Sequence, residues 1–254
     1  MRLTLAAIAA VLPLGALAAA PAADVHTVLA KPVERIQTAD YRALGHLVRV
    51  DASGARTSYP ITLKAHWFPG VLRVFAAIDA PGNARVHVLL EMRSNGQDSI
   101  HIAHPGDKAS SVLPFEKWTD GPLGSGFSYE DFLEAQYFWP SQTVHPGMKY
   151  GARECDLVDS TPGAEDRTHY TEMKTWLDHT IGYPVYVEKT LKGTRTIKEF
   201  TSFGLRQTSG VWSASQVEAK IHGQGGSTLL IIDRGSVKAN LSLKDFGPEQ
   251  MTHF

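Results

Sequence analysis

The sequence predicts a mainly β protein in which one broad, curved antiparallel sheet carries one or two helices on its concave face. Short runs rich in β-branched and aromatic residues recur along most of the 254-residue chain, and turn residues such as Gly, Pro and Asp separate them. The longest such series extends from Met173 to Met251 without a helical interruption. A sheet of that breadth must curl or close, and a concave face can hold a ligand.

The N-terminus has the features of a secretory signal peptide over residues 1–18. Arg2 supplies a positive charge, Leu3 to Leu17 is almost wholly apolar, and Ala16-Leu17-Ala18 fits a cleavage site. The apolar run is shorter than the roughly 20 residues that a membrane-spanning helix needs, which disfavours an uncleaved anchor. No cysteine stands directly after the cleavage site, where a lipid would be attached. We therefore expect an exported, periplasmic, non-lipidated protein with a single domain over residues 19–254.

The first half of this domain predicts a short helix followed by a meander. The helix is expected around Val33 to Gln37, and turn residues such as Pro69-Gly70 separate the strands after it. The expected strands are Arg42 to Val50, Ser58 to Phe68, Val71 to Ile78, Arg85 to Met92 and Ser99 to Ala103. Their spacing is typical of an all-β sandwich or barrel.

A segment without period-two alternation lies in the middle of the chain and predicts a helix from Phe127 to Trp139. Ser128 and Asp131 resemble a capping box, and Pro140 ends the helix. The glycine-rich residues 121–126 predict a turn or a hinge before it. The helix is either a displaceable plug in the concave face or a permanent part of the core, and the sequence leaves both interpretations open.

The second half predicts another antiparallel meander. The expected strands are Met173 to Asp178, Val185 to Thr190, Thr196 to Phe200, Gly210 to Trp212, Thr228 to Asp233 and Ala239 to Phe246. Aromatic side chains are the candidates for a ligand-binding cavity or its plug. They are Phe127, Phe132, Tyr137, Trp139 and Trp176. Strand parity does not show which of them face the hollow, because the register of the concave face is unknown.

Charge and motifs give little support for catalysis, metals or cofactors. The formal net charge of −1 disfavours a nucleic-acid-binding protein, which usually has a basic excess. His101 and His104 point to different faces of a strand and lack a third ligand, so we expect surface histidines and no metal site. Cys155 is the single cysteine and has acidic neighbours, which favours a buried apolar role over a nucleophile. No nucleophile elbow or dinucleotide fingerprint is present, so we predict neither an enzyme nor a bound cofactor.

Several segments resemble the periplasmic lipoprotein carriers of the LolA/LolB-like family, in particular the outer membrane lipoprotein-sorting branch. Residues Gly124 to Asp131 are similar to the branch's Gly-Ser-Asp-Phe-Ser-Tyr-Glu-Asp segment, with Gly126 in place of the acid. Trp176-Leu177-Asp178 followed by Pro184 resembles its Trp-Ile-Asp…Pro pattern.

Two further segments resemble the same branch with departures. Gly210-Val211-Trp212 matches a Gly-x-Trp-x-Pro strand start, although Ala214 stands where Pro is usual. Asn240 and Phe246 are placed like the terminal Asn…Phe-Thr segment, although Gly247 replaces the Thr. The resemblance covers most of residues 19–254 and implies a half-open β-barrel whose helices cover an apolar cavity for acyl chains.

The sequence therefore predicts a non-catalytic periplasmic carrier of the acyl chains of lipoproteins or of other lipids. Its expected partners are the lipid or lipoprotein cargo, an inner-membrane transporter as donor and an outer-membrane acceptor, with no nucleic acid. One alternative is a periplasmic sensor or accessory module that serves an inner-membrane partner. A hydrolase is the remaining alternative.

Overall fold

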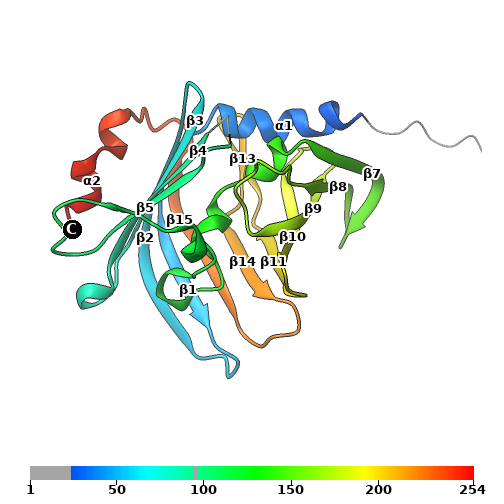
Figure 1. Ribbon diagram of the computed structural model, residues 1–254. Coiled ribbons are helices and arrows are strands. Elements are labelled where there is room, and N and C mark those ends of the chain that lie inside the picture. The colour runs from blue at the N-terminus through cyan, green and yellow to red at the C-terminus, as the bar shows by residue number, and fades with distance from the viewer. Residues whose placement is uncertain (1–23, 94–95) are drawn as a thin grey trace, which may run out of the picture.

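The computed structural model describes residues 24–93 and 96–254 (Figure 1). The predicted signal peptide, residues 1–18, lies outside the described residues. The first helix, α1, is Val25–Gln37, and Asp24 caps it by accepting hydrogen bonds from the backbone of His26 and Thr27. The following strands are β1 (Asp40–Val50), β2 (Arg56–Phe68), β3 (Val71–Ile78), β4 (Val86–Arg93), β5 (Ser99–Ala103) and β6 (Ser111–Val112).

The second half of the chain contains the remaining strands and a short C-terminal helix, α2 (Pro248–Thr252). The strands are β7 (Ser141–Tyr150), β8 (Arg153–Thr161), β9 (Tyr170–Asp178), β10 (Pro184–Leu191), β11 (Ile197–Phe203), β12 (Arg206–Thr208), β13 (Val211–Ser213), β14 (Gln216–Ile221) and β15 (Ser227–Ser236). Short 3₁₀ helices are Gly82–Ala84, Phe115–Lys117, Pro122–Gly124, Tyr129–Phe132, Ala135–Phe138 and Leu243–Phe246.

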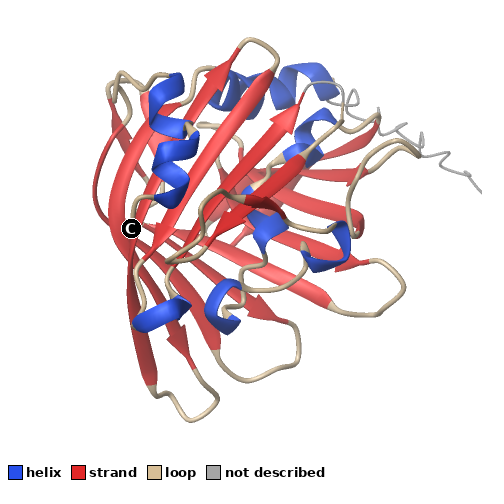
Figure 2. Ribbon diagram, turned by 60° about the vertical axis from the view of Figure 1, so that its left-hand side comes forward, coloured by secondary structure: helices blue, strands red, loops and turns tan. Residues whose placement is uncertain are grey.

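Thirteen of these strands form one antiparallel sheet in the order β6-β5-β4-β3-β2-β1-β15-β14-β11-β10-β9-β8-β7. The sheet curves strongly, and β6 and β7 stand at its two ends without pairing with each other, so it is an open half-barrel (Figure 2). β12 and β13 form a separate two-stranded hairpin. No helix in the described part of the chain combines the length and the apolarity that crossing a membrane requires.

The two predicted meanders join where β1 pairs with β15. Leu47 stands opposite Leu230, and the register shifts between Leu44 and Gly45. A Cβ atom at Gly45 would lie 1.9 Å from the carbonyl oxygen of Ile231, so a residue without a side chain is required at this bulge. The sheet is therefore continuous across the boundary between the two halves.

That core lies on the concave face and is built from alternate strand residues. Two segments cover it: α1, and the stretch between β6 and β7, residues 113–140, which we call the inner segment. The buried side chains that meet there include Leu29 and Ile36 of α1, Leu47, Ile61, Leu72 and Leu90 of the sheet, and Trp118, Phe127, Leu133 and Tyr137 of the inner segment. Burial of these apolar surfaces is the main favourable contribution to stability.

The C-terminal segment covers part of the opposite, convex face. Phe246 and Met251 pack against Phe75 and Leu89, which alternate with the concave-face residues of β3 and β4. Nζ of Lys64 donates a hydrogen bond of 2.9 Å to Oε1 of Gln250. Figure 1 shows α2 on the outer side of the sheet, away from the inner segment.

The predicted fold class is confirmed, and two predicted elements are wrong. The stretch from Phe127 to Trp139 is not one helix but two 3₁₀ turns, Tyr129–Phe132 and Ala135–Phe138. The capping box of Ser128 and Asp131 is present, but Leu133 has extended φ and ψ angles of −91° and 126° and ends the first turn. Tertiary contacts of the two acids in this turn, described below, override the local helical propensity.

The predicted strand from Ala239 to Phe246 is also wrong. Asn240 has a positive φ of 54°, and a second capping box, formed by Ser242 and Asp245, opens a 3₁₀ helix. This turn carries Phe246 into the convex-face cluster, where burial of the ring compensates for the lost strand pairing. The N-terminal helix, in contrast, is longer than the short stretch that the sequence predicted.

Candidate functional site

An apolar cavity of about 250 Å³ lies between the concave face and the elements that cover it. The floor consists of Leu63, Ala65, Leu72, Val74, Leu230 and Ile232 from β2, β3 and β15. These positions are two apart on each strand, so period-two alternation aims them at the same side of the sheet. The cavity is therefore a direct consequence of the alternating pattern on β2, β3 and β15, with β1 lying between β2 and β15.

The cover of the cavity comes from α1 and from the β12–β13 hairpin. Ile36 lies in the last turn of α1, Ala39 follows the helix, and Trp212 lies on β13. Ser209 and Gly210 have φ angles of 49° and 85°, as tight two-residue hairpin turns require. The hairpin is not paired to the main sheet. Directly after it, the N–H of Ser215 donates to the carbonyl oxygen of Phe203 at 3.1 Å, and the carbonyl oxygen of Ser215 accepts from the N–H of Ile232 at 2.8 Å.

Polar groups line one side of the cavity. Nη2 of Arg35 donates to Oε1 of Glu134 at 2.7 Å, and the guanidinium carbon lies 5.3 Å from the centre of the Tyr183 ring. The hydroxyl of Tyr183 accepts a hydrogen bond of 3.2 Å from the backbone N–H of Ala214. Burial raises the pKa of Tyr183 above its ordinary value. An apolar cavity with a few convergent polar groups is the usual form of a small-ligand site.

A buried ion cluster fixes the inner segment next to this cavity. The carboxylate of Asp131 is fully buried, pairs with Nζ of Lys189 at 3.2 Å and also pairs with Nζ of Lys198. The hydroxyl of Tyr170 donates a hydrogen bond of 2.6 Å to the same carboxylate. Burial alone would raise the pKa of Asp131, but Lys198 and Lys189 outweigh it and hold this pKa well below its usual range.

The neighbouring residue, Glu130, forms a second anchor. Its carboxylate accepts hydrogen bonds from the Thr168 hydroxyl and from the backbone N–H of His169 at 3.0 Å, and Nδ1 of His169 lies 2.9 Å from it. Glu130 is 4 % exposed, so replacing these bonds by water would require the segment to move away from the sheet. Both anchors favour the inner segment as a permanent part of the core over a displaceable plug.

The five sequence-predicted candidates do not all meet at the cavity. Phe132 lines it, and Phe127 stacks on Phe132 with 5.7 Å between ring centres. Tyr137 is buried in the same core. Trp139 belongs to a separate cluster with Tyr170 and Met173. Trp176 alternates with the buried Leu177 on β9 and packs on the ring of Tyr186 at 5.1 Å.

The residues that α1 and the polar side contribute to the cavity were not predicted from the sequence as ligand-binding candidates. The apolar positions Leu29, Pro32 and Ile36 follow helical spacing, which could have predicted a full helix with a buried face. Arg35 carried no such signal, because one arginine in an amphipathic helix is usually a solvated residue.

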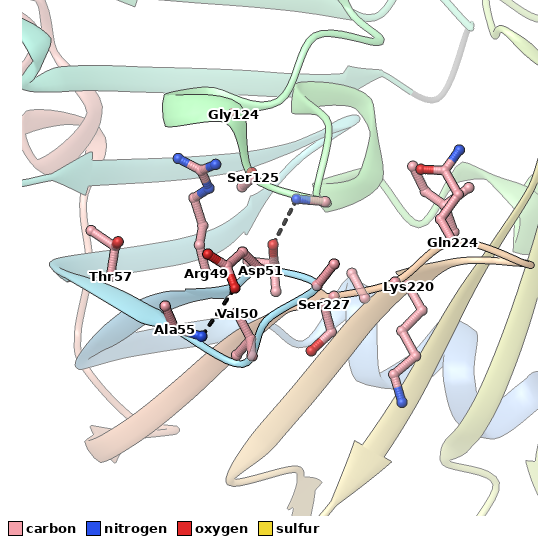
Figure 3. A pocket seen from close by; sticks show the side chains of 17 residues that line it. Arg49, Val50, Asp51, Ala55, Thr57, Gly124, Ser125, Lys220, Gln224 and Ser227 are labelled. Atoms are coloured by element: carbon pink, nitrogen blue, oxygen red, sulfur yellow. Dashed lines mark hydrogen bonds between the residues drawn. The ribbon is translucent and has the colours of Figure 1, made fainter.

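A second, polar cavity of about 370 Å³ lies beside the ends of β1 and β15 and the glycine-rich residues 124–126 (Figure 3). The N–H of Gly126 donates to Oγ1 of Thr228 at 2.7 Å. Nη1 of Arg49 donates to the carbonyl oxygen of Leu123 at 3.0 Å, and Figure 3 shows the guanidinium beside Gly124. The glycine-rich turn that suggested a hinge is therefore bonded to the sheet on both sides.

Two other candidates from the sequence have structural explanations. Cys155 is 1 % exposed, and burial raises the pKa of its thiol, which disfavours the reactive thiolate. Nδ1 of His104 lies 3.0 Å from the carbonyl oxygen of Arg85. Among residues 24–93 and 96–254 no group of three or more His, Cys, Asp or Glu side chains is arranged to hold a metal ion.

Solved structures with the same fold include proteins from three bacteria. An outer membrane lipoprotein-sorting protein domain from Vibrio parahaemolyticus has a TM-score of 0.78 at 19 % identity, covering 90 % of this chain and 99 % of that one. A DUF1329 family protein from Desulfovibrio piger has a TM-score of 0.76 at 14 % identity, with coverage of 90 % and 99 %. A LolA superfamily protein from Nitrosomonas europaea has a TM-score of 0.64 at 12 % identity, with coverage of 89 % and 98 %.

Sequence comparison adds a family without a described function. No curated protein matches the chain. A family model described as "Uncharacterized protein" matches residues 78–253, which is more than half of the chain. The chain has a LolA-like fold, and it belongs to the family of uncharacterized proteins that this model defines.

Proposed function

We propose that the protein is a non-catalytic periplasmic carrier that binds the acyl chains of lipoproteins or of other lipids in the apolar cavity. The observation that carries the proposal is the cavity itself, which has an aliphatic floor on the concave face and a helix and a hairpin above it. Each methylene moved from water into such a site gains about 0.8 kcal/mol, so a chain needs few polar contacts to bind. No catalytic group is required for this role.

The fold supports the same proposal. The Vibrio parahaemolyticus relative of this fold is described as a lipoprotein-sorting domain, and the match covers 90 % of this chain. Export through a signal peptide at residues 1–18 would place the domain, residues 19–254, between the two membranes. An inner-membrane donor and an outer-membrane acceptor are then the expected partners, because a carrier must exchange its cargo at both ends.

The size of the cavity defines what such a carrier must do. A volume of about 250 Å³ is slightly below the roughly 300–1,000 Å³ that is usual for small-molecule sites. A long acyl chain would therefore enlarge the cavity on entry. Because the inner segment is anchored by Asp131 and Glu130, we expect α1 and the β12–β13 hairpin to yield instead.

The test combines extraction of a native ligand with a variant that fills the cavity. Protein purified without detergent should yield a lipid by mass spectrometry, and delipidated protein should bind a fluorescent fatty acid. Ala65→Trp puts an indole into the cavity and should weaken binding of the probe about tenfold or more, because the two compete for one volume.

The matched control is Ala152→Trp, since Ala152 lies exposed between β7 and β8. This variant should bind the probe like the wild type. Absence of both a native lipid and probe binding would reject the carrier. A stable complex with a membrane protein and no lipid would instead support a sensor or accessory module.

A further inference from the structure

A third cavity, of about 290 Å³, adjoins the apolar one and differs from it in chemistry. We call it the outer cleft. Polar and charged residues such as Lys31, Glu34 and Gln207 line it. Five residues line both spaces and form the partition between them: Arg35, Thr38, Tyr183, Val211 and Trp212. Figure 1 shows α1 and β13, which contribute to this partition, next to each other above the sheet.

Arg35 is the charged group of the partition, and its hydrogen bonding is incomplete. One nitrogen, Nη2, bonds Glu134, whereas Nε is buried without a hydrogen-bond partner among residues 24–93 and 96–254. A guanidinium has five N–H donors in a fixed plane, and a buried donor without a partner is costly. Because the Arg35 side chain lines both spaces, a small shift of the partition would let an acceptor oxygen of a ligand reach this N–H and would hold the ligand between them.

A second cation stands at the mouth of the outer cleft. Nζ of Lys31 donates a hydrogen bond of 2.6 Å to the carbonyl oxygen of Thr180, and no carboxylate of the described residues pairs with it. A Cβ atom at Gly182, where φ is +64°, would lie 2.6 Å from Cβ of Lys31, so α1 is held close to the β9–β10 turn. The position of the ammonium is thus defined, and its charge is available to an anion.

We propose that this site selects amphiphiles by their head group: an apolar chain fills the inner cavity, and an oxygen acceptor, either a carboxylate or an ester, binds Arg35 at the partition. Lys31 adds charge attraction for a carboxylate. The inference rests on the proposed binding of acyl chains and adds the recognition of the head. It distinguishes this site from a purely apolar groove, which would take any chain of suitable length.

Displacement of a neutral fluorescent probe, N-phenyl-1-naphthylamine, distinguishes recognition of the head group from binding of the apolar chain alone. Dodecanoate, methyl dodecanoate and dodecylammonium share one chain and differ in the head. Dodecanoate and the ester should displace the probe at concentrations about tenfold lower than dodecylammonium, since a hydrogen bond to a charged group is worth at least that factor. Equal displacement by all three would overturn the inference and leave the carrier proposal standing, whereas failure of the probe to bind at all would reject both.

Variants assign the selectivity to its residues. Arg35→Gln should reduce the preference for both oxygen heads about tenfold, and Arg35→Lys should recover part of the carboxylate preference only. Arg35→Gln leaves the Glu134 carboxylate without its partner. If this single variant folds poorly, the double variant Arg35→Gln, Glu134→Gln removes the unpaired carboxylate. Lys31→Gln should weaken dodecanoate and leave the ester unchanged, which distinguishes charge attraction from hydrogen bonding.

The matched control is Arg195→Gln, because Arg195 is exposed in the turn after β10. It should keep the wild-type order of ligands. Probe affinity, measured in parallel, should stay within about twofold of the wild type in all variants, since the probe has no anionic head. Unchanged head selectivity in folded Arg35→Gln protein would refute the assignment.

Discussion

Replacing Asp131 by Asn should destabilise the protein more than any conservative change at its partners. The side chain of Asp131 is 0 % exposed, and those of Lys189 and Lys198 are 6 % and 7 % exposed, so all three charges are removed from water. The cluster has two positive charges and one negative charge, a net +1. Asp131→Asn leaves +2 with no compensating group, and removing one partner of a buried ion pair costs about 3–5 kcal/mol.

The same charge count predicts an asymmetry between the partners. Lys198→Met leaves one lysine and one aspartate, a balanced pair, so its cost should be less than half that of Asp131→Asn. Urea unfolding followed by circular dichroism gives both free energies of unfolding. The matched control is Asp120→Asn in the same inner segment, because Asp120 is 56 % exposed, and its loose pair with Lys117 at 3.6 Å should contribute less than about 0.5 kcal/mol.

The pH dependence provides an independent measurement. The folded-state pKa of Asp131 is depressed, so its stabilisation is fully present above the ordinary value of 3.8 and is lost as pH falls below it. Wild-type protein should therefore lose stability below about pH 4 more steeply than Asp131→Asn. A loss of less than about 1 kcal/mol in Asp131→Asn at neutral pH would refute the view that this cluster anchors the inner segment.

Two further variants test the cavity and the convex face. Phe132→Ala should lower the free energy of unfolding by about 3 kcal/mol, at the low end for phenylalanine truncation, because the ring already faces a cavity. The variant should also bind long-chain probes more tightly. Unchanged probe affinity would mean that the ring does not limit the size of the cavity. Burial lowers the pKa of His87, which stacks on Phe254 at 4.0 Å. The stabilisation by the neutral His87 ring should be present above pH 6.5 and lost as pH falls. Between about pH 7.5 and 5, the free energy of unfolding of His87→Phe should therefore depend less on pH than that of the wild type.

The sequence was informative where the pattern was local. Val71 to Ile78 and Ser99 to Ala103 were predicted with the bounds that the structure has, because apolar residues and flanking turns mark both ends. β7 was missed, since it is an exposed edge strand with Pro146 and Gly147 in the middle and no apolar face. A strand is predictable from its sequence when burial of its residues produces an apolar pattern, and an exposed strand lacks this pattern.

The errors share one cause. Ser128 with Asp131 and Ser242 with Asp245 are the same local motif, and each begins a single 3₁₀ turn. In the first case we extended the turn into a long helix, and in the second we expected a strand. The length of such a turn is set by what its acid contacts elsewhere: lysines of β10 and β11 for Asp131, and Arg42 and Lys64 for Asp245. Those partners are between 58 and 203 residues away, beyond the range of local propensity.

The cavity was harder to predict because it is assembled from distant segments. Arg35 precedes the sheet, Glu134 lies in the inner segment 99 residues later, and Trp212 lies on a hairpin outside the main sheet. None of these residues stands out in its own stretch of sequence, and the pairing of β1 with β15, which joins the two meanders, brings them together. The aromatic side chains of the inner segment predicted that this segment gates or fills the cavity. Its buried ion pairs and hydrogen bonds nevertheless hold it in place. The β12–β13 hairpin covers the cavity without pairing to the main sheet, so we expect stability and ligand entry to depend on different parts of the cover.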